Sequence, residues 1–454
     1  MEHSNKTILE TVFKVLNDSG LDYCVQNKYE MMPEEIPSDI DMFYRGVSEA
    51  DLDKIVVEIS KKLDISVCQK TSMGYFGFVY MLSPLNPKKK FQLQLDFQLE
   101  FSPRQFTHVY LPDSMLNNKQ FYNFFYIPSF DDEIVYTIIR RVVKNDFNKD
   151  HLKKICYLYS KDIKGITNKL RENLPSEVCE IIIKLMVSND VSFFNENYAV
   201  LHKYCKELSI KNSTWKKRIS QRYFDVKVQI SRRFINPMGL TVAFISPDGG
   251  GKSTVINLIK ETCSGVFHGV EEKYFRPRLF KNPGSYNLIN PTEEISNNPD
   301  PHSRPVNSGF KSFIRYFFYN LDFLLGHVFI IIPHKLKRRL VIYDRYYYDY
   351  YVDMKRYQYK LPKFVPRLFS FMIPTPDLVF ILDAPADVIY SRKKELSLNE
   401  IERQRVIFSK MSKQIKNAYL INTDRPIENV VKEVTELIIK KKVAQTLKKL
   451  TIEK

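Results

Sequence analysis

The sequence offers little that would anchor the chain in a membrane or brace it with disulfides. No apolar run reaches the roughly eighteen residues that a transmembrane helix needs, and the longest one, Phe323 to Ile332, is interrupted by Gly326 and His327. The amino terminus lacks the apolar core of a signal peptide. The six cysteines are scattered without a C-x-x-C pair, which is typical of thiols that serve as small core residues. These absences predict a cytoplasmic protein with no transmembrane segment, disulfide or cysteine-bound metal.

The chain carries a formal net charge of +17 but no recognisable nucleic-acid-binding motif. An excess of positive charge of this size could bind nucleic acid, an anionic membrane surface or phosphorylated substrates. Much of it lies in ordinary helical stretches and in residues 440–454. The sequence therefore favours a lysine-rich, solvated surface that includes anion-binding pockets. At 454 residues, with 44% hydrophobic residues, the chain has the material for two or three packed domains.

One stretch in the middle of the chain combines the parts of a phosphate-binding loop. Residues 240–245 form an apolar run typical of a buried parallel strand. Three glycines at 249–251 follow, then Lys-Ser-Thr at 252–254, and residues 255–259 carry apolar side chains at helical spacing. Strand, glycine-rich turn and helix in this order are the context that a phosphate-binding loop requires.

The chemistry of such a loop accounts for its residue types. Glycines permit the backbone angles that turn successive N–H groups toward phosphate oxygens at a helix N-terminus. Lys252 would reach the β- and γ-phosphates of ATP, and the Ser253 hydroxyl would bind Mg²⁺. The usual pattern begins with a glycine, where this sequence has Ser246. The stretch predicts ATP and Mg²⁺ as cofactors.

Motifs in the carboxyl-terminal half resemble those of the thymidylate kinases. The loop Ser-Pro-Asp-Gly-Gly-Gly-Lys-Ser-Thr is similar to the G-x-D-G-x-G-K-S-T loop of that family, with Asp248 at the place of its aspartate. An apolar strand at 339–346 ends in Asp-Arg-Tyr, and the run at 378–383 is similar to the family's next strand. The arginines within 391–405 resemble its lid. The resemblance covers residues 240–442.

The resemblance assigns roles to individual residues. Those expected to hold ATP are Asp248, Gly249, Gly250, Gly251, Lys252, Ser253, Thr254 and Arg403. Those expected to act in phosphoryl transfer are Lys252, Asp344, Arg345, Asp349 and Arg392. Ser253 and Asp344 would bind Mg²⁺, and the cations expected on the lid are Arg392, Lys393, Arg403 and Arg405. Asp349 and Asp353 are four residues apart and would share a helix face, where they either orient an acceptor hydroxyl or face solvent.

These parts predict ATP- and Mg²⁺-dependent transfer of a phosphoryl group to a small, anionic acceptor, such as a nucleotide, a sugar phosphate or a related metabolite. Thymidine monophosphate is expected to be a poor acceptor, because this chain has bulky side chains at the positions that shape the family's thymine pocket. These side chains are Tyr347, Tyr348, Tyr350 and Tyr351. The segment 274–278 also lacks the glutamate of the family's Arg-Glu-Pro-Gly motif. Two alternatives stay open: a bifunctional nucleotidyltransferase and kinase, and a regulatory protein that ATP switches without small-molecule turnover.

The amino-terminal half holds a second group of candidate residues. Asp39 and Asp41 point to one face of an expected strand, and an alternating strand at 91–101 places Asp96 on its polar face. Three carboxylates on neighbouring strands can hold Mg²⁺ against a nucleoside triphosphate. This pattern resembles the nucleotidyltransferase fold over residues 1–105, although the Gly-Ser pair of that family is missing. The acids form either a metal site or part of a solvated surface.

The expected fold is α/β, with a P-loop NTPase domain of parallel strands and flanking helices preceded by an α+β domain and a helical connector. The predicted boundaries are 1–130 for the nucleotidyltransferase-like domain, 131–236 for the connector, 237–442 for the thymidylate kinase-like domain and 443–454 for a basic tail. Residues 281–309 read as a long loop. The aromatic helix expected from Phe310 to about Ile332 either packs in the core, which the sequence favours, or contacts a lipid-linked substrate. The sequence does not fix the oligomeric state, and a homodimer is one arrangement that it allows.

Overall fold

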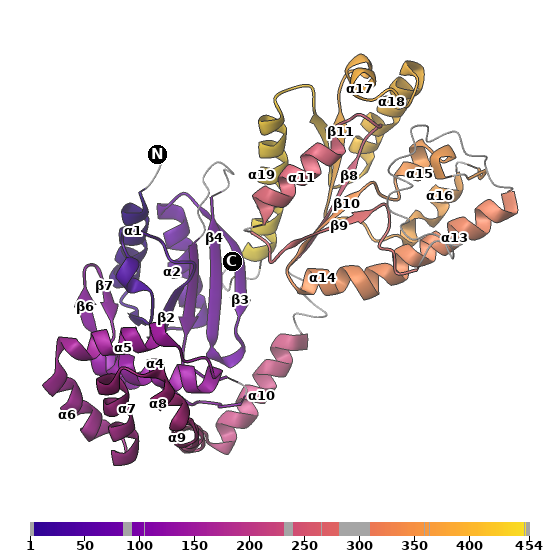
Figure 1. Cartoon of the computed structure of the whole chain (residues 1–454). Helices are drawn as coiled ribbons and strands as arrows, with labels where there is room; N and C mark the ends of the chain where they lie inside the picture. Colours follow the sequence, from indigo (N-terminus) through magenta and orange to yellow (C-terminus); the bar gives the residue numbers. More distant parts are fainter. Residues whose placement is uncertain are drawn as a thin grey trace. The chain divides into compact units, whose positions relative to one another are not determined.

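The computed structural model describes residues 4–84, 93–103, 105–230, 239–264, 266–280, 309–357, 359–362, 364–448 and 450. These residues fall into two compact units (Figure 1). Unit 1 takes the described residues of Met1–Pro84 and Lys89–Ile230 together with the chain from Thr446, and unit 2 takes those of Ser231–Gln445. The boundary expected near 235–237 and the loop expected at 281–309 lie outside the described residues, except for Gly309.

Unit 1 is built on a mixed five-stranded sheet. Its strands are β1 (Asp22–Val25), β2 (Ile40–Arg45), β3 (Ser66–Ser72), β4 (Gly77–Ser83) and β5 (Leu93–Gln98), in the spatial order β1-β2-β5-β4-β3. β2 and β5 are parallel, and the other neighbours are antiparallel. Leu93, Leu95 and Phe97 of β5 alternate into a core that is covered by α1 (Asn5–Asp18) and α2 (Glu49–Lys62). After the strand ends the alternation is lost, so Leu99 is exposed and Glu100 is buried.

Helices that the sequence assigned to a separate connector pack in the same unit as this sheet. Phe43 of β2 meets Tyr136 edge to face at 5.3 Å, and both belong to one apolar cluster with the helices that follow. The connector helices are α4 (Phe130–Lys144), α5 (Lys149–Lys161), α6 (Ile163–Asn173), α7 (Ser176–Ser188), α8 (Val191–Glu196), α9 (Tyr198–Asn212) and α10 (Trp215–Ile230), and α3 (Asp113–Asn117) precedes them within the predicted first domain. A short hairpin, β6 (Gln120–Tyr122) and β7 (Phe125–Ile127), lies between α3 and α4 in the chain.

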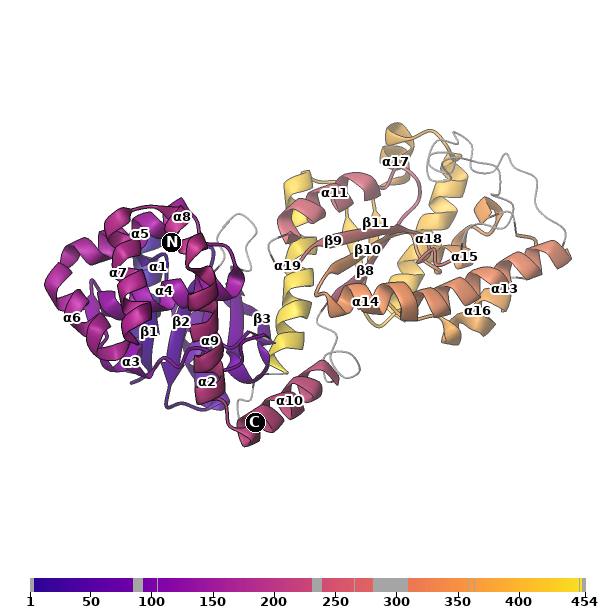
Figure 2. The ribbon, with the colours of Figure 1, turned by 60° about the horizontal axis from the view of Figure 1, so that its bottom comes forward.

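Unit 2 contains a wholly parallel five-stranded sheet, which confirms the predicted α/β fold class. The strands are β8 (Leu240–Ile245), β9 (Val270–Tyr274), β10 (Leu340–Asp344), β11 (Leu378–Asp383) and β12 (Ala418–Asn422), in the order β12-β11-β8-β10-β9. The helices are α11 (Lys252–Cys263), α13 (Gly309–Gly326), α14 (Ile332–Leu336), α15 (Asp349–Val352), α16 (Phe364–Phe369), α17 (Ala386–Arg392), α18 (Leu398–Gln414) and α19 (Ile427–Leu447). α13 and α18 contribute to the core on one face of the sheet, and α11 and α19 lie on the other (Figure 2). α19 extends into the segment expected to form a basic tail.

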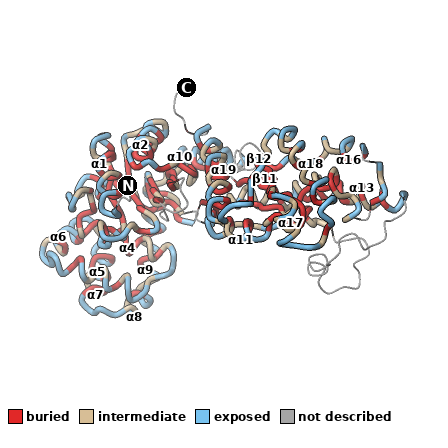
Figure 3. Tube along the Cα trace, turned by 90° about the horizontal axis from the view of Figure 1, so that it is seen from above, coloured by how far each residue is buried: buried red, intermediate tan, exposed pale blue. Residues whose placement is uncertain are grey.

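α13 is a long and strongly apolar helix. It continues through a π-helical turn, His327–Ile331, into α14, and the 28 residues Gly309–Leu336 are long and apolar enough to cross a membrane by length and composition. Only 39% of the most apolar 18-residue stretch of this segment is buried. The core interpretation therefore describes one face of this helix, and exposed positions follow along the other (Figure 3).

Candidate active site

A cavity of about 390 Å³ opens at the carboxyl ends of the central strands of unit 2. β8 lies between β11 and β10 in the sheet, and ligands of open α/β sheets bind outside the carboxyl ends of such strands. The cavity is lined by Asp248, Gly249, Gly251, Lys252, Ser253, Thr254, Tyr274, Asp344, Arg345, Arg356, Arg392, Lys393 and Glu395. Most of the residues predicted for the ATP site are therefore brought together here.

The loop after β8 has the backbone of a phosphate cradle. Gly249 and Gly251 have φ angles of 89° and 93°, which residues other than glycine rarely adopt. A Cβ on Gly250 would lie 2.6 Å from the Ser246 Oγ, so this position also requires glycine. Ser246 itself is not among the described residues with positive φ, which explains why serine can replace the glycine of the usual pattern. A turn of this kind before the N-terminus of α11 is typical of anion-binding loops.

Lys252 lies inside the cavity with its ammonium held by oxygen atoms of the loop. Its Nζ donates hydrogen bonds to the Ser246 carbonyl at 3.2 Å and to the Ser246 Oγ at 3.0 Å, and it lies 4.0 Å from the Asp248 carboxylate. Burial, followed by the charge of Arg345, lowers the pKa of Lys252 to about 8, although Asp248 and Asp344 oppose this shift. An incoming triphosphate would bring negative charge next to this ammonium and so stabilise its protonated form.

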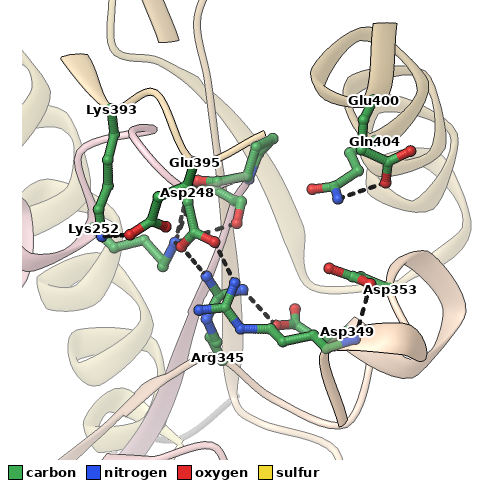
Figure 4. Close-up of polar contacts among 12 residues, drawn as sticks. Asp248, Lys252, Arg345, Asp349, Asp353, Lys393, Glu395, Glu400 and Gln404 are labelled. Carbon is green, nitrogen blue, oxygen red and sulfur yellow. Dashed lines mark hydrogen bonds and ion pairs between the residues drawn. The ribbon is translucent and has the colours of Figure 1, made fainter. Parts of the chain in front are cut away.

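Asp248 connects the loop to two arginines that line the same cavity. Its carboxylate accepts a hydrogen bond from Arg345 (Figure 4) and another from Arg356. Burial alone would raise the pKa of Asp248, but Arg345, Lys252 and Arg356 outweigh it and hold the pKa far below its usual range. Arg345 has a φ of 71° and donates a second hydrogen bond to Asp349 at 2.8 Å. The two guanidinium groups are thus fixed in place at one end of the cavity.

Arg356 is a cavity residue to which the sequence gave no role. It lies in a short turn twelve residues after Asp344, and nothing in the local pattern distinguishes it from a surface arginine. Its proximity to Asp248 depends on how the segment after β10 folds back toward the loop. Tyr274 and Glu395 also line the cavity without having been predicted. The adjacent pair Lys355-Arg356 was the only sequence signal available.

Asp344 and Ser253 offer oxygen atoms that fit a magnesium ion. Asp344 ends β10, and its Oδ1 is buried without a hydrogen-bond partner among the described residues. Burial raises the pKa of Asp344, against the influence of Lys252 and Arg345. A buried, unpartnered carboxylate oxygen and a hydroxyl that line one cavity are suitable donors for Mg²⁺, which prefers oxygen ligands.

The four cations expected on the lid take different places. Arg392, at the end of α17, lines the cavity and donates to the Thr423 carbonyl at 3.0 Å, and Lys393 lines the cavity beside it. Arg403 does not line the cavity, because it donates to Glu400 and to the Val352 carbonyl. Arg405 donates to Asp383. In this conformation only the first two cations face the triphosphate site.

The carboxylates after β10 are not a solvated face. Asp349 is 2% exposed and accepts hydrogen bonds from Arg345 and from the Tyr357 hydroxyl at 3.1 Å. Its Oδ1 has no partner among the described residues. Asp353 is half-buried and accepts from the Arg356 backbone N–H at 3.2 Å. Of the two, Asp349 therefore lies nearer to the charged groups of the cavity.

The tyrosines after Asp-Arg-Tyr pack away from the P-loop cavity. Tyr347 and Tyr350 are each 1% exposed and pack in the core under α13. Tyr347, Tyr348 and Tyr351 line a second cavity, of about 420 Å³, which shares none of its lining residues with the P-loop cavity. Apart from Tyr274, the P-loop cavity is lined by loop and charged residues.

The three predicted carboxylates of unit 1 also meet. Asp41 and Asp96 are paired in the parallel register of β2 and β5, and one oxygen from each of Asp39, Asp41 and Asp96 lies within 4.8 Å of the others. Lys28 donates to Asp39, and Arg140 lies 3.5 Å from Asp41. Burial raises the pKa of Asp96 to about 7, with further contributions from its acidic neighbours that a hydrogen bond from Gln94 opposes.

Comparison with known proteins gives structural matches alone. No protein-family model matches the sequence, and no curated protein matches it. The chain is similar to the thymidylate kinase of Ehrlichia chaffeensis, with 22% identity, 44% of this chain and 98% of that chain covered, and a TM-score of 0.30. It is also similar to the thymidylate kinase of Candida albicans, with 16% identity, 45% of this chain and 93% of that chain covered, and a TM-score of 0.33. Identities this low bear on the fold alone, so function has to be argued from the residues of the cavity.

The pKa of Lys252 leads to a prediction for ATP binding. Bound triphosphate stabilises the charged ammonium, so the complex holds a proton that the free protein loses above about pH 8. ATP affinity should therefore be constant between about pH 7 and 8 and fall as the pH rises further, by up to about tenfold per unit. Calorimetric titrations in buffers of different ionisation enthalpy would measure the affinity and the accompanying proton uptake.

The matched control for this pH dependence is Lys252→Arg. A guanidinium does not lose its proton in this range, and Asp248, Asp344, Asp349 and Arg345 face the variant as they face the parent. If the parent and the arginine variant lost affinity equally above pH 8, Lys252 would not be the titrating group.

Proposed function

We propose that unit 2 is an ATP- and Mg²⁺-dependent phosphotransferase that acts on a small, anionic acceptor. The observation that carries this proposal is the pairing, in one cavity, of a lysine-bearing glycine loop with two arginines fixed by Asp248. The loop provides for the triphosphate, and the two arginines beside it provide for an anionic acceptor. Similarity to the fold of thymidylate kinases agrees with this division of the cavity.

Each residue has a part that its position supports. The loop and Lys252 bind the β- and γ-phosphates, while Arg392 and Lys393 approach from α17 to balance charge on the transferring group. Bound Mg²⁺, held by Ser253 and Asp344, supplies electrostatic stabilisation of the phosphate oxygens. Arg345 and Arg356 orient the acceptor, and Asp349 holds Arg345 in place from behind.

Asp349 is a positioning residue before it is a candidate base. Its Oδ2 is occupied by Arg345 and Tyr357, whereas the free Oδ1 could accept a proton from an acceptor hydroxyl. Asp349→Asn would keep the shape and one acceptor oxygen but remove the base. A role as base should show in the variant as a loss of kcat with little change in KM for the acceptor, whereas a positioning role should raise KM for the acceptor.

The direct test is a screen of phosphate acceptors for acceptor-dependent release of ADP by the full chain. Nucleoside monophosphates, sugar phosphates and neutral sugars would be compared at the same ATP concentration. The proposal expects turnover with an anionic acceptor and little without one. ATP binding accompanied by trace hydrolysis, whatever acceptor is added, would instead favour a nucleotide-gated regulatory protein.

Thymidine monophosphate should be a poor acceptor. Tyr347 and Tyr350 are buried where the resemblance places the thymine pocket, and packed sites tolerate little overfilling. We expect a specificity constant below about 10⁴ M⁻¹s⁻¹, under the range of ordinary enzymes on their own substrates. Steady-state kinetics would measure it, with ribose 5-phosphate as an acceptor that lacks a base. A constant in the ordinary range would show that the tyrosines leave room for thymine.

A second candidate function belongs to unit 1. The clustered oxygens of Asp39, Asp41 and Asp96, with Lys28 and Arg140 beside them, could hold Mg²⁺ and a nucleoside triphosphate for nucleotidyl transfer. The chain would then be bifunctional. This proposal rests on the meeting of the carboxylates and not on any match of unit 1 to a known protein.

The two sites can be separated by variants. In a Lys252→Ala background that silences the site in unit 2, Asp39→Asn/Asp41→Asn should weaken residual binding of Mg²⁺–ATP by at least about tenfold. Asp51→Asn is the matched control, because its carboxylate is exposed on α2 and takes no part in the cluster. Calorimetry would give both affinities, and equal binding by the double variant and its control would exclude a metal site in unit 1.

A further inference from the structure

α13 has two apolar faces, and among the described residues only one of them packs in a core. Tyr316, Tyr319 and Phe323 face the core, where Phe323 meets Tyr346 edge to face at 5.3 Å. The opposite face carries large apolar side chains at the spacing of a single helix face. We call this surface the α13 stripe, and it consists of Phe310, Phe313, Ile314, Phe317 and Leu321, with exposed fractions from 37% to 75%.

The neighbouring helix adds to the exposed apolar surface. Phe364 and Leu368 of α16 are four residues apart and 64% and 60% exposed, and Phe371 in the turn that follows is 81% exposed. α16 lies beside α13 (Figure 2), and Tyr316 of α13 contacts Phe369 with ring centroids 6.0 Å apart. An outer surface of this composition is unusual for a helix that faces only water.

The exposed charges of the chain segment that holds these helices are of one sign in the part that the structure describes. Residues 309–376 contain four aspartates and no glutamate, and all four aspartates are buried or half-buried. The charged side chains that are exposed in the described part of this segment are Lys311, Lys337, Lys355, Lys360 and Arg367. The exposed apolar residues are thus accompanied by cations without exposed carboxylates.

Aromatic and aliphatic residues combined with lysine and arginine are the composition of helices that lie on anionic lipid. We propose that the α13 stripe and α16 dock the protein on an anionic membrane surface, with α13 lying in the plane of the lipid head groups. The apolar side chains would enter the boundary between head groups and acyl chains, and the lysines and arginines would meet the lipid phosphates. This inference does not depend on the proposed phosphotransferase activity.

The buried face of α13 argues against a spanning helix. Asp322 is fully buried and accepts hydrogen bonds from the Arg276 guanidinium and from the backbone N–H groups of Arg278 and Phe280. A helix that left unit 2 to cross a bilayer would take an unpaired carboxylate into lipid. Docking in the membrane plane keeps these contacts.

The charge pattern also favours lipid over a second copy of the chain. In a two-fold symmetric dimer the same surface patch faces itself. Lys311, Lys360 and Arg367 would then lie near their own copies with no exposed carboxylate from this segment to neutralise them. Lipid phosphates provide the opposite charge.

Vesicle binding by the full chain would test the proposal. The protein would be sedimented with vesicles of equimolar phosphatidylcholine and phosphatidylglycerol, and with vesicles of phosphatidylcholine alone. We expect at least tenfold tighter binding to the anionic vesicles, weakened by added salt. The variant Phe310→Ser/Phe313→Ser/Phe317→Ser should lose at least tenfold in affinity for them. A matched control, Val187→Ser/Ile210→Ser, removes comparably exposed apolar side chains from unit 1 and should bind as the parent does.

A second variant separates the contribution of charge and does not disturb any apolar packing. Lys311→Gln/Lys360→Gln/Arg367→Gln should lose most of the preference for anionic over neutral vesicles, and thermal unfolding followed by circular dichroism would verify that each variant is folded. The proposal is overturned if the parent binds neither kind of vesicle, binds both equally, or loses as much affinity in the unit 1 control. Light scattering that shows a dimer of the parent and a monomer of the phenylalanine variant, without vesicle binding, would assign the surface to a second copy.

Discussion

Acceptor-dependent ATP turnover should fall by about 10²–10³ or more when Lys252 is replaced by alanine. The Lys252 ammonium lies within the glycine loop. In the free protein it donates hydrogen bonds to Ser246 of that loop. ATP would replace those contacts with phosphate oxygens, which are held more strongly in the transition state as charge shifts toward the leaving group. Stopped assays of ADP release at saturating acceptor would measure the loss.

Lys260→Ala is the matched control for this variant. It removes the same side chain from the same helix, but Lys260 pairs with Glu272 and does not line the cavity. Turnover should stay close to that of the parent. If Lys252→Ala turned over ATP at the parental rate, the loop would not be the site of phosphoryl transfer.

Asp248→Asn should have the largest effect on stability among the single substitutions considered. The carboxylate is 8% exposed and is the partner of both Arg345 and Arg356. Its removal leaves two buried guanidinium groups with less compensating charge, and breaking a buried ion pair in this way costs about 3–5 kcal/mol. Denaturant unfolding followed by a probe in unit 2 would measure the change, because the two units need not unfold together.

The control for Asp248→Asn is Asp383→Asn. Asp383 also pairs with an arginine, Arg405, but both side chains are more than 20% exposed, and pairs of this kind contribute about 1 kcal/mol or less. Added ATP should restore part of the stability lost in Asp248→Asn, since phosphate can take the place of the missing carboxylate. Equal losses in the two variants would mean that Asp248 is no more important to unit 2 than a surface acid.

The parts of the site that could be predicted are those in which sequence neighbours remain spatial neighbours. An apolar strand, three glycines and Lys252 follow one another within thirteen residues, so the local pattern is sufficient to locate the loop. Alternation also predicted the face of the strand on which Asp96 lies, whereas its meeting with Asp41 depended on the two strands being neighbours, as they are in the structure. In both cases the period of the backbone carries the information.

The remaining parts depend on how distant segments approach one another, which no local pattern encodes. Arg356 reaches Asp248 across 108 positions of sequence, and Arg403 leaves the cavity because Glu400 and the Val352 carbonyl hold it elsewhere. The burial of one face of α13 was predicted from its composition, but its exposed face was not. A run of aromatic residues shows that a helix is apolar and does not show on how many sides it is covered.

The carboxylate of Asp248 acts as a resident counter-ion for the acceptor end of the cavity. In the free protein it already satisfies the two guanidinium groups that would hold an anionic acceptor. Binding is therefore an exchange of anions. The incoming ligand must compete with a carboxylate that is part of the chain and loses no translational entropy when it pairs with the arginines. A ligand with a single diffuse charge would only replace the negative charge that Asp248 already provides to the arginines. A phosphate dianion could bind both arginines, and the Asp248 carboxylate would then be neutralised by Lys252. We therefore expect the cavity to favour doubly charged groups even before any other part of the acceptor is contacted.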